Sequence, residues 1–153
     1  MTVEPSLFRV VYVSRSLLPE PAAGPELERI LARARRGNAA RGITGALLFS
    51  EDCFAQALEG PAPAVEEVFE AIQCDPRHAD VVVLEAAPVA AREFGAWSMA
   101  YAGRSRQAGA RFSTLAGAGP GEAAKAAGRV LGLLRAVVDR RAGAQGPAAA
   151  VPA

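Results

Sequence analysis

The chain has 153 residues, of which 51% are hydrophobic and 22% charged, and its formal net charge is +1. This composition is typical of one globular domain with a sizeable core, and the balanced charge argues against binding to nucleic acid or to an acidic membrane surface. The N-terminus lacks the basic start of a secretion signal and no stretch approaches the roughly 20 apolar residues of a membrane span, so we expect a cytoplasmic protein.

The N-terminal part predicts a strand followed by a helix. β-Branched and aromatic residues alternate over residues 7–15, which predicts a strand with Tyr12 on one face, beside Phe8, Val10 and Ser14. From about residue 25, apolar side chains recur with helical spacing. Gly37 and Asn38 tolerate a left-handed C-cap and are predicted to stop this helix.

Residues 43–60 predict two apolar strands joined by a tight turn at residues 50–53. On the second strand Phe54, Gln56 and Leu58 share one face, since successive side chains alternate. Gln56 is therefore a carboxamide where the pattern favours a hydrophobic residue. Because an unpaired buried Gln costs about 1–3 kcal/mol, we expect a polar partner for it.

The second half predicts a helix that ends near residues 75–76, a short buried strand at 81–84 and a last strand around 97–101. A third helix over residues 122–140 carries an apolar stripe. We divide the chain into a main domain (1–103), a linker (104–121), a C-terminal helix (122–141) and a disordered tail (142–153).

The order β-α-β-β-α-β, followed by a short strand and a helix, predicts an α+β fold with a ferredoxin-like sandwich. We expect the first and third strands to be parallel neighbours in the middle of the sheet, which places Tyr12 beside Gln56 beneath the two helices. The C-terminal helix is predicted to cover the opposite face.

Tyr12 and Gln56 have an ordinary explanation, since a Tyr–Gln hydrogen bond can simply close a core. Asn38 likewise has one as a helix stop. What Asn38 and Gln56 share is a flat group that offers both a donor and an acceptor. Such groups suit a flat heterocycle that carries an amide-like N–H beside a carbonyl.

Over roughly residues 7–102 the sequence resembles the BLUF family of flavin-binding blue-light sensors. The matching stretches are FRVVYVSRS, GNAARGITGALLFSEDCFAQALEG, VEEVFEAIQCDPRH and REFGAWSMAYA. The resemblance implies the same ferredoxin-like sheet. It also implies that Tyr12 is the photoactive tyrosine, that Gln56 is the switching glutamine and that Asn38 bonds the flavin amide edge. The implied cofactor is FAD, with FMN or riboflavin as alternatives.

Four further residues match the family pattern. Arg77 corresponds to a basic residue near the flavin carbonyl and phosphate, with His78 beside it, and Trp97 and Met99 correspond to a pair on the last strand whose nearness to the flavin is open. Each has an ordinary alternative. Arg77 could pair with Asp75 at the surface, His78 could be a helix-end residue, and Trp97 and Met99 could be core.

The resemblance implies a light-driven hydrogen-bond switch without catalytic turnover, so no enzyme activity is predicted. No output domain is recognised after residue 141, which predicts a short stand-alone sensor that signals to an unknown protein partner and forms a homo-oligomer, a dimer or larger. Gly37 departs from the family, whose members often place a side chain near the flavin there. Binding strength and dark recovery are expected to differ accordingly.

Two other functions fit the fold. An acylphosphatase-like phosphohydrolase would use an Arg after the first strand, where Arg15 stands, although Asn38 precedes its strand instead of lying on it. A ligand-free assembly module would use Gln56 only in its core. Cys53 and Cys74 form neither a metal-binding spacing nor a disulfide framework, and no metal site is predicted.

Overall fold

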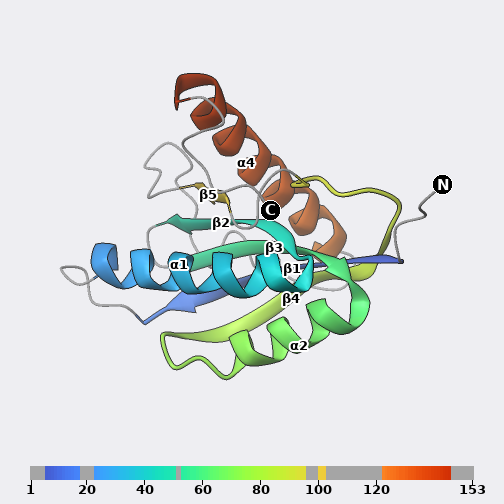
Figure 1. Cartoon of the computed structure of the whole chain (residues 1–153), viewed down its shortest axis with the longest axis horizontal. Helices are drawn as coiled ribbons and strands as arrows, with labels where there is room; N and C mark the ends of the chain where they lie inside the picture. The colour runs from blue at the N-terminus through green and yellow to red at the C-terminus, as the bar shows by residue number, and fades with distance from the viewer. Residues whose placement is uncertain (1–5, 18–22, 51–52, 96–99, 103–121, 146–153) are drawn as a thin grey trace.

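A computed structural model describes residues 6–17, 23–50, 53–95, 100–102 and 122–145 (Figure 1). In chain order the elements are β1 (Leu7–Ser16), α1 (Ala23–Arg41), β2 (Thr44–Ser50), β3 (Cys53–Pro61), α2 (Ala62–Gln73), β4 (His78–Val89), β5 (Ala100–Ala102) and α4 (Glu122–Gln145). The strands form one sheet in the order β4-β1-β3-β2-β5. The predicted ferredoxin-like α+β fold is confirmed.

The predicted direction of the third strand is wrong, because β1 and β3 are antiparallel neighbours. The hairpin between β2 and β3 reverses the chain, whereas the crossover through α1 returns β2 in the direction of β1. A strand lying between β1 and β2 must therefore run opposite to both. The predicted neighbourhood nevertheless holds, since Tyr12 is the register partner of Gln56.

Helix α1 does not stop at Gly37 and Asn38 but continues to Arg41. The residue that ends it is Gly42, whose φ of 71° is the left-handed conformation that glycine adopts readily. The Gly42 N–H donates to the Ala39 carbonyl and the Ile43 N–H donates to the Asn38 carbonyl, which is the Schellman pattern of a helix end. Asn38 therefore lies within the last turns of the helix.

Strand β4 is longer than predicted and lies at an edge of the sheet. It begins at His78, well before residue 81, and its central Val83 is 40% exposed. An edge strand needs only one partner, so its sequence can carry polar residues outside the apolar run. At the other edge, β5 pairs in parallel with β2. Of the predicted last strand, residues 97–99 lie outside the described residues.

Two separate hydrophobic clusters lie on the two faces of the sheet. The helices α1 and α2 cover the face that carries Tyr12, and α4 covers the other face with Val130 and Leu134, both fully buried (Figure 1). The predicted docking of the C-terminal helix is confirmed. Helix α4 extends to Gln145, beyond the predicted end of the C-terminal helix at residue 141.

The division of the chain into a main domain, a linker and a tail stays a prediction, because residues 103–121 and 146–153 lie outside the described residues. Within the part of the chain that the structure describes, no helix combines the length and the hydropathy that crossing a membrane requires.

Candidate functional site

A cleft of about 950 Å³ opens between α1, the C-terminal end of α2 and the sheet. Its volume lies in the range of small-molecule and cofactor sites. Helix α1 contributes one face at helical spacing, consisting of Ile30, Arg33, Ala34, Gly37, Asn38 and Arg41. All the predicted flavin-contacting residues that the structure describes line this cleft, namely Tyr12, Asn38, Gln56, Arg77 and His78.

Tyr12 and Gln56 form a buried pair at the floor of the cleft. The Tyr12 hydroxyl donates to Gln56 Oε1 at 2.5 Å, and the two residues are 3% and 6% exposed. Burial raises the pKa of Tyr12, and the Asp75 carboxylate adds to the rise. The phenol is therefore neutral and available as a donor. The expected juxtaposition of these two groups is confirmed.

Asn38 reaches the cleft from α1 and is 3% exposed. The predicted helix end at this residue is wrong, but its predicted place in the site is retained. Asn38 of α1 and Gln56 of β3 thus each bring a carboxamide to the same cleft. Both groups can donate and accept, so together they suit a ligand whose edge alternates donors and acceptors.

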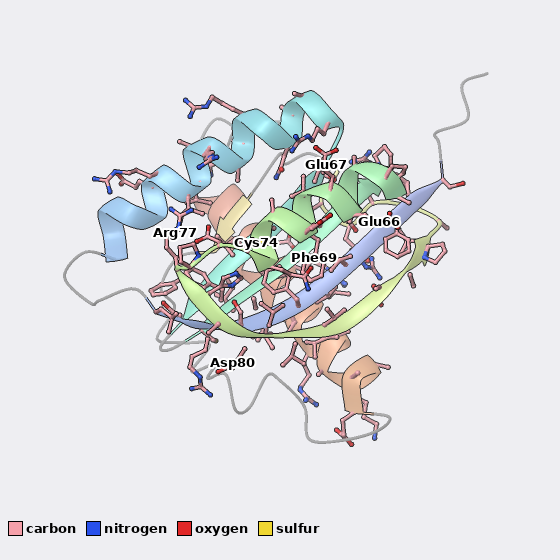
Figure 2. All side chains as sticks on the ribbon, turned by 90° about the horizontal axis from the view of Figure 1, so that it is seen from below. Glu66, Glu67, Phe69, Cys74, Arg77 and Asp80 are labelled. Carbon is pink, nitrogen blue, oxygen red and sulfur yellow. The ribbon has the colours of Figure 1, made fainter. Side chains whose placement is uncertain are left out.

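Arg77 pairs with Asp75 on the wall of the cleft, as its ordinary explanation anticipated. Its Nε and Nη2 atoms donate to the two carboxylate oxygens, with Nη2 to Oδ2 at 2.6 Å, and its backbone N–H donates to Oδ1 at 2.9 Å. The hydrogen bond from Arg77 lowers the pKa of Asp75, so the pair is charged. Figure 2 shows Arg77 near the end of α2 that also carries Cys74. The pair thus fixes a cation at the cleft without excluding a ligand contact.

His78 is held by protein groups at both ring nitrogens. Nε2 lies 2.6 Å from the Ile72 carbonyl, which can only accept, so Nε2 carries a hydrogen. In the neutral ring Nδ1 then accepts from the Ser14 hydroxyl at 2.7 Å. The imidazole ring also lies edge-on to Tyr12 and Phe54, with centroids 6.3 Å away in each case. His78 therefore bonds the last turn of α2 and forms part of the cleft wall beside the Tyr12 ring.

Several site residues were missed by the sequence analysis. Ser14 lies on the predicted face of β1, but its bond to His78 follows from an element far along the chain. Arg33 and Arg41 also line the cleft, and Arg41 belongs to α1 only because the helix continues past residue 38. Arg41 also pairs with Glu67, which Figure 2 shows on the side of α2 toward α1. The signal for these arginines was helical spacing, since Arg33 lies four residues before Gly37 and Arg41 three residues after Asn38.

Two predicted photoactive residues, Trp97 and Met99, lie outside the described residues. The phosphohydrolase alternative finds no support in the cleft. Its key residue, Arg15, pairs instead with Asp80 at 3.1 Å, with its side chain 45% exposed, and does not belong to the cleft lining. Asp80 lies on β4, away from the Arg77 end of α2, in Figure 2.

Comparison with known proteins gives a consistent result. The BLUF family, described as sensors of blue-light using FAD, matches residues 7–100. The photoactivated adenylate cyclase subunit beta of Euglena longa is 36% identical over 99 residues, which cover 64% of this chain. The chain spans only 11% of the length of that relative.

Solved structures agree with the fold. The dark-state structure of the BLUF protein BlrB has a TM-score of 0.68 at 31% identity, covering 86% of this chain and 100% of BlrB. Klebsiella pneumoniae BlrP1, solved with FMN and cyclic diGMP, has a TM-score of 0.57 at 39% identity, covering 62% of this chain and 25% of BlrP1. With the cleft, the buried tyrosine–glutamine pair and these matches together, the chain belongs to the BLUF family of blue-light sensors.

Proposed function

We propose that this blue-light sensor holds a flavin in the cleft between α1 and α2 and uses Tyr12 and Gln56 as its hydrogen-bond switch. The observation that carries the proposal is the buried Tyr12–Gln56 bond at the floor of a cofactor-sized cleft. The carboxamides of Asn38 and Gln56 suit the amide edge of a flavin, and Arg77 suits its carbonyl or phosphate oxygens.

The residues fit the chemistry that this switch requires. A bound flavin would supply absorption of blue light and, once excited, a strong oxidant. The Tyr12 hydroxyl holds the proton that must leave when the phenol loses an electron, and Gln56 Oε1 is positioned to receive it. Return of the electron and proton restores Tyr12. Gln56 is then left rotated about its terminal bond or in another tautomer, so it presents a different group to the cleft.

The size of this switch limits its output. Exchanging one buried hydrogen bond for another is worth about 1 kcal/mol. Such a bias shifts a closely balanced conformational equilibrium several-fold but does not reverse a strongly biased one. We therefore expect a modest structural response that a partner reads, and not a large domain movement.

Among flavins we propose FAD, which the description of the family also names. Arg33 and Arg41 support this choice, because two cations on the α1 wall can contact the phosphates of a dinucleotide. FMN is the alternative, since BlrP1 was solved with FMN. Extraction of the bound flavin from purified protein and its identification by mass separates them.

The proposed output is a change at the C-terminal region that a second protein reads. The Euglena relative carries the name of an adenylate cyclase, which shows that a BLUF region can belong to an enzyme. The partner of this chain, its assembly into a homo-oligomer and its cytoplasmic location stay predictions.

An absorption spectrum before and after blue illumination tests the function. We expect a yellow protein whose flavin band moves slightly to longer wavelength in the light and returns in the dark. A colourless protein that hydrolyses phosphate esters would support the hydrolase instead. A colourless, inert protein would leave the assembly module.

A further inference from the structure

A carboxylate is fully buried on the face of the sheet opposite the cleft. Glu59 of β3 is 0% exposed. Its oxygens accept from the backbone N–H of Glu93 at 3.0 and 2.9 Å and from that of Phe94 at 2.9 Å. Arg9 of β1 approaches the same carboxylate at 3.4 Å. Burial of a charged carboxylate costs free energy unless such partners surround it. The bonds of Glu59 therefore hold the backbone of residues 93 and 94 in place.

The segment that Glu59 binds also contacts α4. Residues 92–94 lie between β4 and β5, and Arg92 also donates to Thr44 Oγ1 of β2 at 2.9 Å. Phe94 is buried in the cluster under α4. The Glu93 carboxylate pairs with Arg135 of α4 at 3.3 Å. Residues 92–94 are thus held to the central strands on one side and contact the C-terminal helix on the other.

Glu59 and Gln56 lie on the same strand but point to opposite faces. They are separated by about 10 Å along β3, at roughly 3.3 Å per residue. Hydrogen bonds to a charged acceptor are stronger than the neutral bond that Gln56 makes. A displacement of β3 would be transmitted to residues 93 and 94 through these bonds.

We propose that Glu59 is a positioning residue that couples a light-driven change at Gln56 to residues 92–94 and to α4. This inference rests on the proposed function, since it names the route by which the structural change at Tyr12 and Gln56 reaches α4. Its physical basis is a chain of contacts through one strand, one carboxylate and one connection.

The test compares Glu59→Gln with the wild type in the dark and under blue light. The amide keeps the shape of the side chain but removes its charge and turns an NH₂ group toward backbone N–H donors. Glu59 lies outside the cleft, so we expect the flavin spectral shift to be retained. Backbone amide exchange in α4 should differ between light and dark in the wild type, and this difference should be lost in the variant.

Glu85→Gln is the matched control. Glu85 pairs with the same Arg9, at 2.6 Å, but from the edge strand β4. We expect this variant to keep the light-dependent exchange in α4. Loss of the difference in both variants would overturn the specific role of Glu59, as would a wild-type difference in Glu59→Gln.

Glu59→Asp keeps the test decisive if Glu59→Gln folds poorly. It retains the charge beside Arg9 but shortens the reach to the N–H groups of Glu93 and Phe94. The exchange difference in α4 should shrink, and an unchanged difference would contradict the coupling. A wild type without a spectral shift would instead refute the proposed function, whereas a shift without any change in α4 would refute only the coupling.

Discussion

The two faces of the sheet are built from the same strands but pack in different ways. On the face of β3 that α4 covers, Ala55 and Ala57 are small and fully buried in the cluster that α4 completes. The residues that alternate with them face α1 and α2 and include Gln56, which borders the cleft. Small side chains let α4 lie close to the sheet, whereas the other face leaves room for a ligand. A strand with period two can therefore support a dense core and a binding site at once.

Removing one hydroxyl from the cleft face should have the largest effect on function. In Tyr12→Phe the phenol proton is gone, so we expect complete loss of the light-induced spectral shift with flavin still bound. The free energy of unfolding should fall by about 1–3 kcal/mol, because the buried Gln56 Oε1 loses this donor. Difference absorption spectroscopy and denaturant unfolding measure the two quantities.

Phe69→Leu is the control for that variant. Phe69 packs against Tyr12 with ring centroids 5.5 Å apart but provides no hydrogen bond. Its substitution should disturb packing and leave the spectral shift in place. A normal photocycle in Tyr12→Phe would refute the role of Tyr12 as the donor of the electron and the proton.

A cavity on the packed face should act on stability and spare the photochemistry. Leu134 of α4 is fully buried in the cluster between α4 and the sheet. Leu134→Ala should therefore lower the free energy of unfolding by about 2–5 kcal/mol. The flavin spectral shift of the folded variant should match the wild type. Leu133→Ala, at a half-buried neighbouring position, should cost less. Equal losses at both positions would mean that α4 is not seated as described.

The smallest expected effect concerns the rim of the cleft. Arg33→Gln and Arg41→Gln should each weaken FAD and FMN binding about two- to fivefold, the range of an exposed ionic contact. Riboflavin has no phosphate, so its binding should not change. Arg36→Gln, on α1 but outside the cleft lining, is the control. Equal weakening of riboflavin would show that the arginines support the helix and not a phosphate.

The sequence predicted the faces of the strands better than their directions. Alternation over β1 and β3 assigned Tyr12 and Gln56 to their faces, because side-chain period depends only on local geometry, and the predicted strand order made the two strands neighbours. It did not specify that β1 and β3 run antiparallel, since either direction keeps the same residues on the same face of the sheet. That property follows from the order of hairpin and crossover along the chain.

Other predictions were wrong where contacts with distant parts of the chain decided the outcome against a local preference. Gly37 and Asn38 both tolerate a helix end, yet α1 ends at Gly42, where Ile43 can close onto the Asn38 carbonyl. The place of Arg41 in the cleft depended on that longer helix. The role of Glu59 depended on Glu93 and Phe94, and Arg9, its register partner on β1, is likewise distant in sequence.

The shape of β4 has a consequence for self-association. Its pairing with β1 shifts register twice, between Val11 and Tyr12 and again between Val13 and Arg15, and Asp80 takes a φ of 55°. Such irregularities twist an outer strand and prevent it from offering a flat template to another chain. Despite the exposed Val83, continuation of the sheet from one copy into the next is disfavoured there. Any assembly of this sensor should therefore form away from the β4 edge.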